Sequence, residues 1–218
     1  DVCSSDLTIF HLMGQHVNYK QRYRTKQARF WASSYEDKRP ELTNAQRKML
    51  SHYDNATLYN DSIVAQIVKR FQKQDAIVIY VPDHGEECYE ENRGFICRNH
   101  SAEIDWPLAH YEFEIPFWIY CSPKYIRNHR DIYRQIRKAK DKRFMTDALP
   151  HLLLYLAGIE TPTYKEEYNI LSPKYDEMRP RILKNSADYD KLRDAHLEKI
   201  KKEESKKVKR KKGETDYE

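Results

Sequence analysis

Two polar clusters in the chain each follow an apolar run, and their residue types are suited to binding a metal ion. One cluster is Met13–His16, and the other is Asp83–Glu86, which follows Ala76–Val81. A carboxylate beside an imidazole offers the oxygen and nitrogen ligands that zinc binds. Asp83 and His84 are therefore a candidate zinc pair. The alternative is a purely structural Asp–His pair, and the spacing alone leaves both possibilities open.

The backbone after Val81 must bend if both side chains are to reach one ion. Neighbouring residues of a strand point to opposite faces. Gly85 makes such a bend inexpensive, because glycine adopts backbone conformations that other residues avoid. In open α/β sheets, ligands collect beyond the carboxyl ends of strands. Both polar clusters are expected at such ends.

The elements that would position the clusters alternate between strand and helix. We expect strands at Leu7–Met13, Ala76–Val81 and Ile115–Cys121, and helices at about residues 43–73, 124–138 and 146–156. Thr43 and Gln46 have the spacing of a capping box at the start of the first helix. A loop of about thirty residues is expected to run to Glu114.

This alternation predicts the fold class. It is typical of an α/β fold with a mostly parallel sheet flanked by helices. Ala76–Val81 is continuously apolar and rich in β-branched residues, which predicts a central parallel strand buried on both faces.

Length and charge limit the class of protein further. The 218 residues suffice for one domain with a core, and no apolar run reaches the ~18 residues of a membrane helix. The net charge is +5, and residues 201–218 hold eight Lys/Arg against five Asp/Glu, so the body is nearly neutral. Nucleic-acid binding is therefore not implied. The Lys run could contact anionic lipid headgroups, although a solvated end is the simpler interpretation.

Three cysteines remain when Cys3, in an atypical N-terminal stretch, is set aside. Cys88 and Cys97 lie nine positions apart in one expected loop. They would form a disulfide in an exported protein or stay free thiols, and the sequence does not decide between the two. Cys121 lies in an apolar strand, which favours a buried structural thiol.

Together the motifs resemble those of a known family, the sulfatase-like phosphoethanolamine transferases of the alkaline phosphatase superfamily. The order and spacing match, over about Leu7 to Ala157. The motifs that carry the resemblance are Met13–His16, Tyr53–Asn55, Tyr59, Asp61, Asp83–Glu86, the later strand Ile115–Trp118 and the last core helix and turn, Phe144–Gly158. The resemblance implies an alkaline phosphatase/sulfatase-like fold.

The resemblance also implies a zinc site and roles for individual residues. Asp83 and His84 match the family's metal-binding pair. His16 matches a catalytic and substrate-binding His near the phosphoryl group. The family's second such His has its nearest counterpart in His100, with His110 as a competitor. Asn55 would bind substrate or orient the metal site, or it would only pack its helix against the sheet.

No residue here matches the Thr nucleophile or the N-terminal acidic zinc ligand of the family. We therefore expect both of them upstream of Leu7. Without them, the residues from Leu7 onward are expected to be catalytically inactive and to bind zinc only weakly. On this interpretation residues 1–6 are a sequencing artefact, residues 7–185 are the C-terminal part of a sulfatase-like catalytic domain, and residues 186–218 are a charged helical or disordered tail.

The implied activity moves phosphoethanolamine from phosphatidylethanolamine to a hydroxyl of lipid A or a glycan, through a zinc-activated Thr phosphoenzyme. It would be a modification of lipopolysaccharide. The implied location is the inner membrane, with the catalytic domain in the periplasm. Helices absent from this stretch would anchor the protein there. No nucleic-acid partner is expected. One alternative is a sulfatase or phosphatase of the same superfamily, and another is a non-catalytic, basic-tailed binding module.

Overall fold

The computed structural model describes residues 6–94, 96–99 and 103–214. They divide into two compact units, which are described here one at a time. The first comprises the residues up to Pro82, together with Cys88–Cys97 and Pro116–Glu177. The second comprises Asp83–Glu87, Arg98–Ile115 and the residues from Met178.

The longest element of the first unit is helix α1 (Asn44–Phe71). The predicted capping box at its start is confirmed. Gln46 N donates to Thr43 Oγ1 at 3.3 Å, and Thr43 N donates to Gln46 Oε1 at 2.9 Å. The two side chains satisfy backbone donors that the first turn of a helix leaves unpaired. Three 3₁₀ turns precede α1: η1 (Tyr19–Gln21), η2 (Thr25–Gln27) and η3 (Ala32–Tyr35).

The turn η3 and α1 share a small apolar core. The core also includes residues of strands β2 (Glu87–Cys88) and β3 (Ile96–Cys97), which form a two-stranded sheet. Its buried members are Tyr35, Leu42, Leu50, Cys88 and Tyr89. Arg39 helps to close it, because its Nη2 donates to the main-chain oxygen of Tyr89 at 2.7 Å. The early loop is therefore fixed against α1 rather than trailing from it.

Strands β1 (Ile77–Tyr80) and β4 (Trp118–Cys121) form a two-stranded sheet that corrects the predicted topology. The pairing is antiparallel, with Ile77 opposite Cys121 and Tyr80 opposite Trp118. All four residues of β1 are only partly buried. A continuous apolar run signals burial, but it carries no information on strand direction, which depends on a partner distant in sequence. The fold is mixed α and β, and the parallel arrangement is not what the described strands show.

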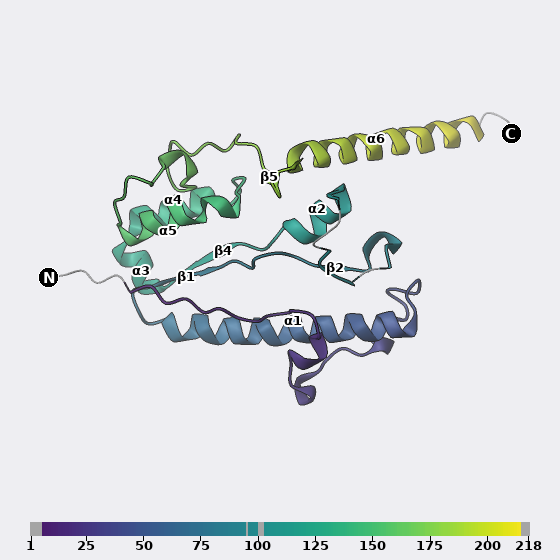
Figure 1. Ribbon diagram of the computed structural model, residues 1–218, viewed down its shortest axis with the longest axis horizontal. Helices are drawn as coiled ribbons and strands as arrows, with labels where there is room; N and C mark the ends of the chain where they lie inside the picture. Colours follow the sequence, from purple (N-terminus) through teal and green to yellow (C-terminus); the bar gives the residue numbers. More distant parts are fainter. Residues whose placement is uncertain (1–5, 95, 100–102, 215–218) are drawn as a thin grey trace. The chain divides into compact units, whose positions relative to one another are not determined.

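Helices cover the sheet β1–β4 on two sides (Figure 1). One side faces α1, and the other faces α4 (Arg130–Ala139) and α5 (Leu149–Ala157). The predicted helix at 124–138 is divided at His129, because a short helix α3 (Pro123–Asn128) precedes α4. The predicted helix at 146–156 begins with a 3₁₀ turn, η5 (Thr146–Ala148). It ends as expected at Gly158, whose φ of 66° is the left-handed conformation of a helix C-cap.

A second apolar core holds α4 and α5 against β4. Leu152 is its fully buried centre. Ile119 of β4 and Phe117, just before that strand, pack against it, and the Phe117 ring stacks on Phe144 with centroids 4.8 Å apart. The 3₁₀ turn η6 (Glu166–Tyr168) follows α5, and Ile170 completes the cluster.

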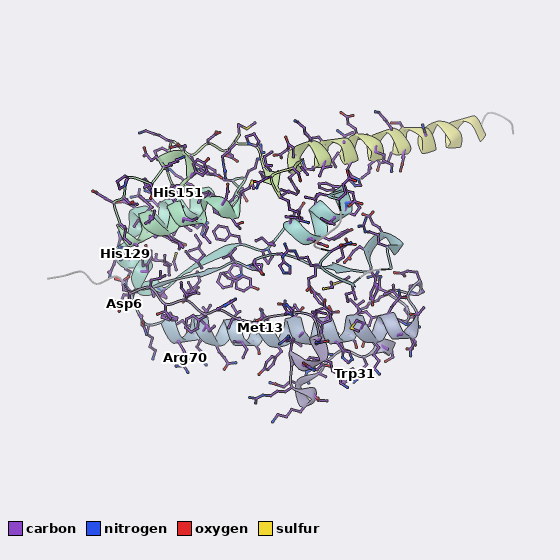
Figure 2. All side chains as sticks on the ribbon, in the orientation of Figure 1. Asp6, Met13, Trp31, Arg70, His129 and His151 are labelled. Carbon is purple, nitrogen blue, oxygen red and sulfur yellow. The ribbon has the colours of Figure 1, made fainter. Side chains whose placement is uncertain are left out.

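The expected first strand, Leu7–Met13, is wrong. These residues form neither strand nor helix, and most of their large apolar side chains are exposed. Met13, at the end of the stretch, is labelled in Figure 2. Phe10 makes one aromatic contact, edge to face with Phe71 at the end of α1, with ring centroids 6.3 Å apart. The apolar run predicted a buried strand, but no strand within the described residues pairs with it. Without such a partner the backbone does not become a strand.

The second unit is built around α2 (Trp106–Phe113) and the long helix α6 (Tyr189–Glu214). A hairpin of β5 (Ile182–Leu183) and β6 (Ala187–Asp188) leads into α6. Its apolar core is made by Ala109, Leu183 and Tyr189. The long loop expected up to Glu114 is thus wrong, because it contains β2, the 3₁₀ turn η4 (Glu90–Asn92), β3 and α2.

The three described cysteines are free thiols. Cys88 is buried, and Cys97 and Cys121 are partly buried. The structure therefore has Cys88 and Cys97 as free thiols and not as a disulfide. Burial raises the pKa of Cys121 above its ordinary value, which fits a structural rather than a reactive thiol. Among the described residues, no helix has the length and apolar content needed to cross a bilayer.

Candidate metal centre

Asp83 and His84 turn toward each other although they are consecutive residues. Asp83 Oδ2 lies 3.7 Å from His84 Nε2. The backbone leaves the strand conformation before this point, since β1 ends at Tyr80 and Asp83 lies in a bend. His84 N donates to the other carboxylate oxygen, Oδ1, at 3.1 Å, which fixes the Asp83 side chain beside its neighbour. The two side chains therefore lie side by side, and their binding of one metal ion stays a prediction.

The imidazole of His84 is oriented by the peptide group that follows it. Nδ1 lies 2.7 Å from the main-chain oxygen of Gly85. A proton on Nδ1 that is donated to this oxygen leaves the lone pair of Nε2 facing Asp83 and available to a metal. The His84 side chain is 20% exposed and that of Asp83 is 89% exposed, so solvent and ions can reach the pair.

Gly85 is required, but for a different reason from the one that the sequence suggested. Its φ does not lie in the left-handed region that favours glycine. Instead, a Cβ atom at this position would lie 2.3 Å from the main-chain oxygen of Tyr111. The bend that carries Asp83 and His84 thus approaches α2 more closely than any side chain permits.

The donor atoms of Asp83 and His84 are of the kinds that bind zinc, but two donors are too few to complete a zinc site. One carboxylate oxygen and one imidazole nitrogen are ordinary zinc ligands, but zinc in proteins takes three or four protein ligands. Within the described part of the chain, no group of three or more His, Cys, Asp or Glu side chains is arranged to hold a metal. Asp83 and His84 would therefore hold zinc only together with further donors.

The structure places His16 and Asn55 in the first unit, whereas Asp83 and His84 belong to the second. His16 is exposed and follows a turn in which its N donates to Met13 O at 3.2 Å. The turn is tied to α1, because Asn60 Nδ2 donates to Gln15 Oε1 at 3.4 Å.

Asn55 is buried on α1, and its side-chain amide is fully occupied. Oδ1 accepts from Arg29 N and Phe30 N, at 2.6 Å and 3.1 Å. Nδ2 donates to Phe30 O and Ser51 O, at 2.8 Å and 2.7 Å. This side chain holds the early loop on the helix.

His100 lies outside the described residues, whereas its competitor His110 is in α2. His110 Nδ1 lies 2.9 Å from Glu114 Oε1, and its ring stacks on Trp106 with centroids 5.4 Å apart. His196 of α6 also stacks on Trp106, at 5.2 Å. These contacts give His110 a packing role within α2, and Trp106 makes the contact with α6.

Tyr189, at the start of α6, donates its hydroxyl to Glu114. Burial first, and then this carboxylate, hold the pKa of Tyr189 well above its ordinary value. Arg181 stacks over the Tyr189 ring, 4.3 Å from its centroid, and forms an ion pair with Asp190 at 2.6 Å. The start of α6 is therefore fixed by polar contacts as well as by its apolar core.

Two buried carboxylates near the pair were not predicted as functional. Glu87 and Glu112 are both fully buried, at 0% exposure. Glu112 accepts from Gly85 N through its main-chain oxygen, at 2.8 Å, and from Asn99 N through Oε1, at 2.7 Å. The sequence held one signal for it, since Glu112 lies between Tyr111 and Phe113 in a helix that is otherwise mostly apolar.

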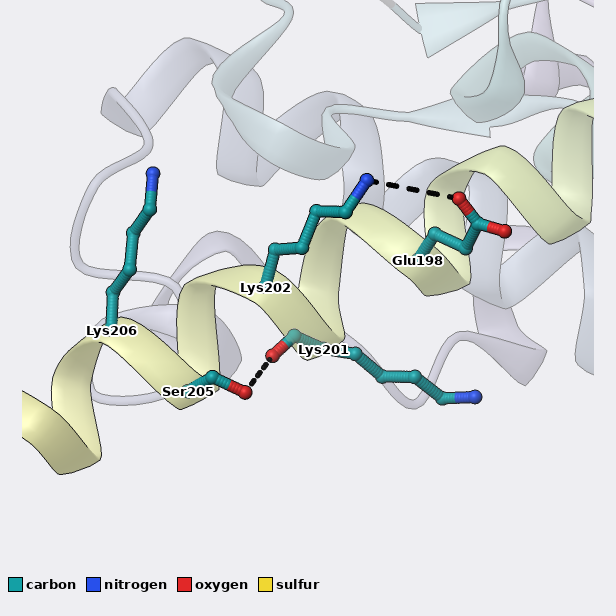
Figure 3. A pocket seen from close by; sticks show the side chains of 5 residues that line it. All are labelled: Glu198, Lys201, Lys202, Ser205 and Lys206. Carbon is teal, nitrogen blue, oxygen red and sulfur yellow. Dashed lines mark hydrogen bonds and ion pairs between the residues drawn. The ribbon is translucent and has the colours of Figure 1, made fainter.

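A shallow hollow on α6 is lined by residues of that helix alone (Figure 3). Its lining residues are Glu198, Lys201, Lys202, Ser205 and Lys206. Lys202 lies 3.8 Å from Glu198, and Ser205 donates to the main-chain oxygen of Lys201 at 2.8 Å. The hollow contains none of the predicted site residues, and its excess of lysines makes it a basic surface.

Comparisons with known proteins relate the chain to one family. Residues 4–159 match the family model described as Sulfatase. Phosphoethanolamine transferase EptC of Escherichia coli K12 is 31% identical over 201 residues, which are 88% of this chain and 33% of that protein. Kdo(2)-lipid A phosphoethanolamine 7''-transferase of the same strain is 31% identical over 140 residues, or 63% of this chain and 23% of that protein. The chain spans about a third of the length of the first relative.

Solved structures agree. The C-terminal periplasmic domain of EptC from Escherichia coli, solved in complex with zinc, is similar with a TM-score of 0.67 and 28% identity. The similarity covers 84% of this chain and 51% of that one. The corresponding domain from Campylobacter jejuni, with a TM-score of 0.57 and 23% identity, covers 76% of this chain and 51% of its own, and supports the fold alone.

Proposed function

Because the chain belongs to the sulfatase family, we propose that it is part of a zinc-dependent phosphoethanolamine transferase. The donor is phosphatidylethanolamine, and the acceptor is a hydroxyl of lipid A or a glycan. The single observation that carries the proposal is the convergence of Asp83 and His84, 3.7 Å apart, just beyond strand β1. The relatives named as phosphoethanolamine transferases support the choice of reaction.

In this proposal Asp83 Oδ2 and His84 Nε2 are two of the zinc ligands. Bound zinc supplies positive charge for phosphoryl oxygens and lowers the pKa of a coordinated hydroxyl. The chain's own contribution is to hold the ligands ready. Gly85 O accepts the proton on His84 Nδ1, which keeps the imidazole in the tautomer whose Nε2 is free. Asp83 is held by the amide of His84.

His16 and His100 are proposed to contact the transferred phosphoryl group. An imidazolium there donates hydrogen bonds and offsets negative charge, and phosphoryl transfer depends largely on such positioning. Asn55 is proposed to act on substrate through the early loop, whose Arg29 and Phe30 amides it binds. The nucleophilic Thr implied by the resemblance matches no residue of this chain, so the phosphoenzyme belongs to the proposal for the whole protein.

The proposed organisation keeps residues 7–185 as part of the catalytic domain and 186–218 as a charged tail, with residues 1–6 as a sequencing artefact. The proposed location is the periplasmic side of the inner membrane. The solved relative described as a periplasmic domain supports this location.

Two measurements test the function. The first is the zinc affinity of the protein encoded by the open reading frame that contains this chain, measured by chelator competition for the wild type, Asp83→Asn and His84→Gln. Each variant is expected to bind zinc at least ten-fold more weakly than the wild type. Mass spectrometry of lipid A then follows expression of the open reading frame that contains this chain, in cells that lack their own transferase. Added phosphoethanolamine that disappears in both variants supports the proposal.

Other outcomes point elsewhere. Unmodified lipid A and unmodified glycans from cells that contain a folded, zinc-binding protein would rule out the transferase. Hydrolysis of a sulfate or phosphate monoester by that protein, lost in the same two variants, would favour the hydrolase alternative.

A further inference from the structure

Glu112 is a fully buried carboxylate that the proposed chemistry does not use. It lies in the last turn of α2 and is 0% exposed. An ionisable side chain is costly to bury, and an apolar residue would be enough to pack a helix of this composition. The retention of a carboxylate at this point therefore calls for a specific partner.

Glu112 has two such partners, and they come from two separate stretches of the chain. Its main-chain oxygen accepts from Gly85 N at 2.8 Å. Its Oε1 accepts from Asn99 N at 2.7 Å. Residues 83–87 and 98–115 belong to the second unit, whereas the intervening residues 88–97 belong to the first. Glu112 thus links residues 83–87 to residues 98–115 by hydrogen bonds to Gly85 and Asn99.

The first of these bonds reaches the candidate metal pair. The last carbonyls of a helix have no partner within the helix, and Gly85 N supplies one for Glu112. The oxygen of the same Gly85 residue lies 2.7 Å from His84 Nδ1. The end of α2 therefore holds the residue that in turn holds the imidazole of His84.

The second bond reaches the residue next to His100. Oε1 fixes the amide of Asn99, and the other oxygen, Oε2, is buried without a hydrogen-bond partner among the described residues. One oxygen of the carboxylate is thus sufficient for this contact. An uncharged side chain that keeps one acceptor oxygen can replace it.

We infer that Glu112 is a positioning residue, which holds the Asp83–Gly85 bend and the Arg98–Asn99 segment in fixed register at the end of α2. The inference rests on the proposed function, since it gives that register a purpose: to keep the zinc pair correctly placed, together with Arg98 and Asn99, the two residues that directly precede His100 in the sequence.

The test compares two uncharged variants of similar size. Glu112→Gln keeps an acceptor oxygen for Asn99 N, and Glu112→Met does not. Amide hydrogen exchange at Asn99 is expected to be at least ten-fold faster in Glu112→Met and close to wild type in Glu112→Gln. Phosphoethanolamine transfer by the protein of the whole open reading frame is expected to fall about ten-fold in Glu112→Met and to be restored in Glu112→Gln. Its zinc affinity is expected to stay within about two-fold of wild type in both variants, because the bond to Gly85 N comes from the main chain.

Asp105→Ala is the control for a general loss of helix stability. It removes the N-cap of α2, whose carboxylate accepts from Leu108 N at 3.0 Å, and leaves the contacts of Glu112 in place. Unchanged Asn99 exchange in Glu112→Met, or equal losses of exchange protection and transfer activity in Asp105→Ala, would overturn the inference. If the wild-type protein of the whole open reading frame transfers no phosphoethanolamine, the proposed function fails, and the exchange rates still decide whether Glu112 holds the segment.

Discussion

The side-chain amide of Asn55 pairs with both the main-chain N and the main-chain O of Phe30. Oδ1 accepts from Phe30 N at 3.1 Å, and Nδ2 donates to Phe30 O at 2.8 Å. The same amide also binds Arg29 N and Ser51 O. A buried side chain with four hydrogen bonds anchors the loop before α1 to the middle of that helix.

Asn55→Ala is therefore expected to lower the free energy of unfolding by about 2–4 kcal/mol, because it leaves partly buried backbone groups without partners. The measurement is urea denaturation followed by circular dichroism. Asn60→Ala is the control on the same helix. Asn60 makes one long hydrogen bond to Gln15, so its loss is expected to cost no more than about 0.5 kcal/mol. Equal stabilities of the two variants would contradict this role for Asn55.

Gly85→Ala is expected to lower the free energy of unfolding by about 2–3 kcal/mol, since the new Cβ would lie 2.3 Å from Tyr111 O. We also expect weaker zinc binding, because the bend must move away from α2. Gly158→Ala is the matched control. Nothing lies within 4 Å of a Cβ there, and the cost of about 1 kcal/mol comes only from its positive φ. A Gly85 variant that is no less stable than the Gly158 variant, with normal zinc affinity, would refute the close approach.

The stability of the protein is expected to depend on His52 in mildly acidic solution. Burial first, and then Lys20 and Lys48, hold the pKa of His52 below its ordinary value of about 6.5. The folded state thus disfavours the charged imidazole, and its Nδ1 lies 3.0 Å from the hydroxyl of Tyr23. The stabilising contribution is full above pH 6.5 and is lost as the pH falls through the lowered pKa.

Denaturant midpoints measured from pH 7.5 down to pH 5 check this. The wild type is expected to lose more stability over that range than His52→Gln, which cannot titrate. Parallel curves for the two proteins would mean that His52 is not the group responsible.

Deletion of residues 199–218 separates the enzyme from the non-catalytic alternative. In the proposed function, the deletion leaves zinc affinity unchanged, because both proposed zinc ligands, Asp83 and His84, lie outside the deleted residues. A basic-tailed binding module would instead lose its salt-sensitive binding to anionic vesicles or polymers. Both properties can be measured on the same two purified proteins.

Local signals made parts of the fold predictable. The capping box of Thr43 and Gln46 and the apolar stripe after it lie within one helix, so the prediction of α1 was correct to within two residues at each end. The end of α5 at Gly158 was equally local. Strand direction was not predictable, because the partner of Ile77 is Cys121, more than forty positions away.

The candidate site shows the same division between local and non-local information. Asp83 and His84 could be found because they are adjacent and follow an apolar run. Helix α2 was missed although Asp105 is an N-cap and Pro107 lies in the first turn, a start signal that a long polar loop obscured. Glu112 could not be found, because its role depends on Gly85 and Asn99, and a lone Glu in a sequence ordinarily indicates a solvated surface.

The exposed residues of the stretch Leu7–Met13 have a practical consequence for handling the purified chain. Several exposed apolar side chains close together in the sequence favour self-association. Those of this stretch are Leu7, Ile9, Phe10, Leu12 and Met13. Light scattering at rising concentration should therefore detect aggregates before any loss of secondary structure. Biophysical work on this chain will require dilute samples or a mild detergent.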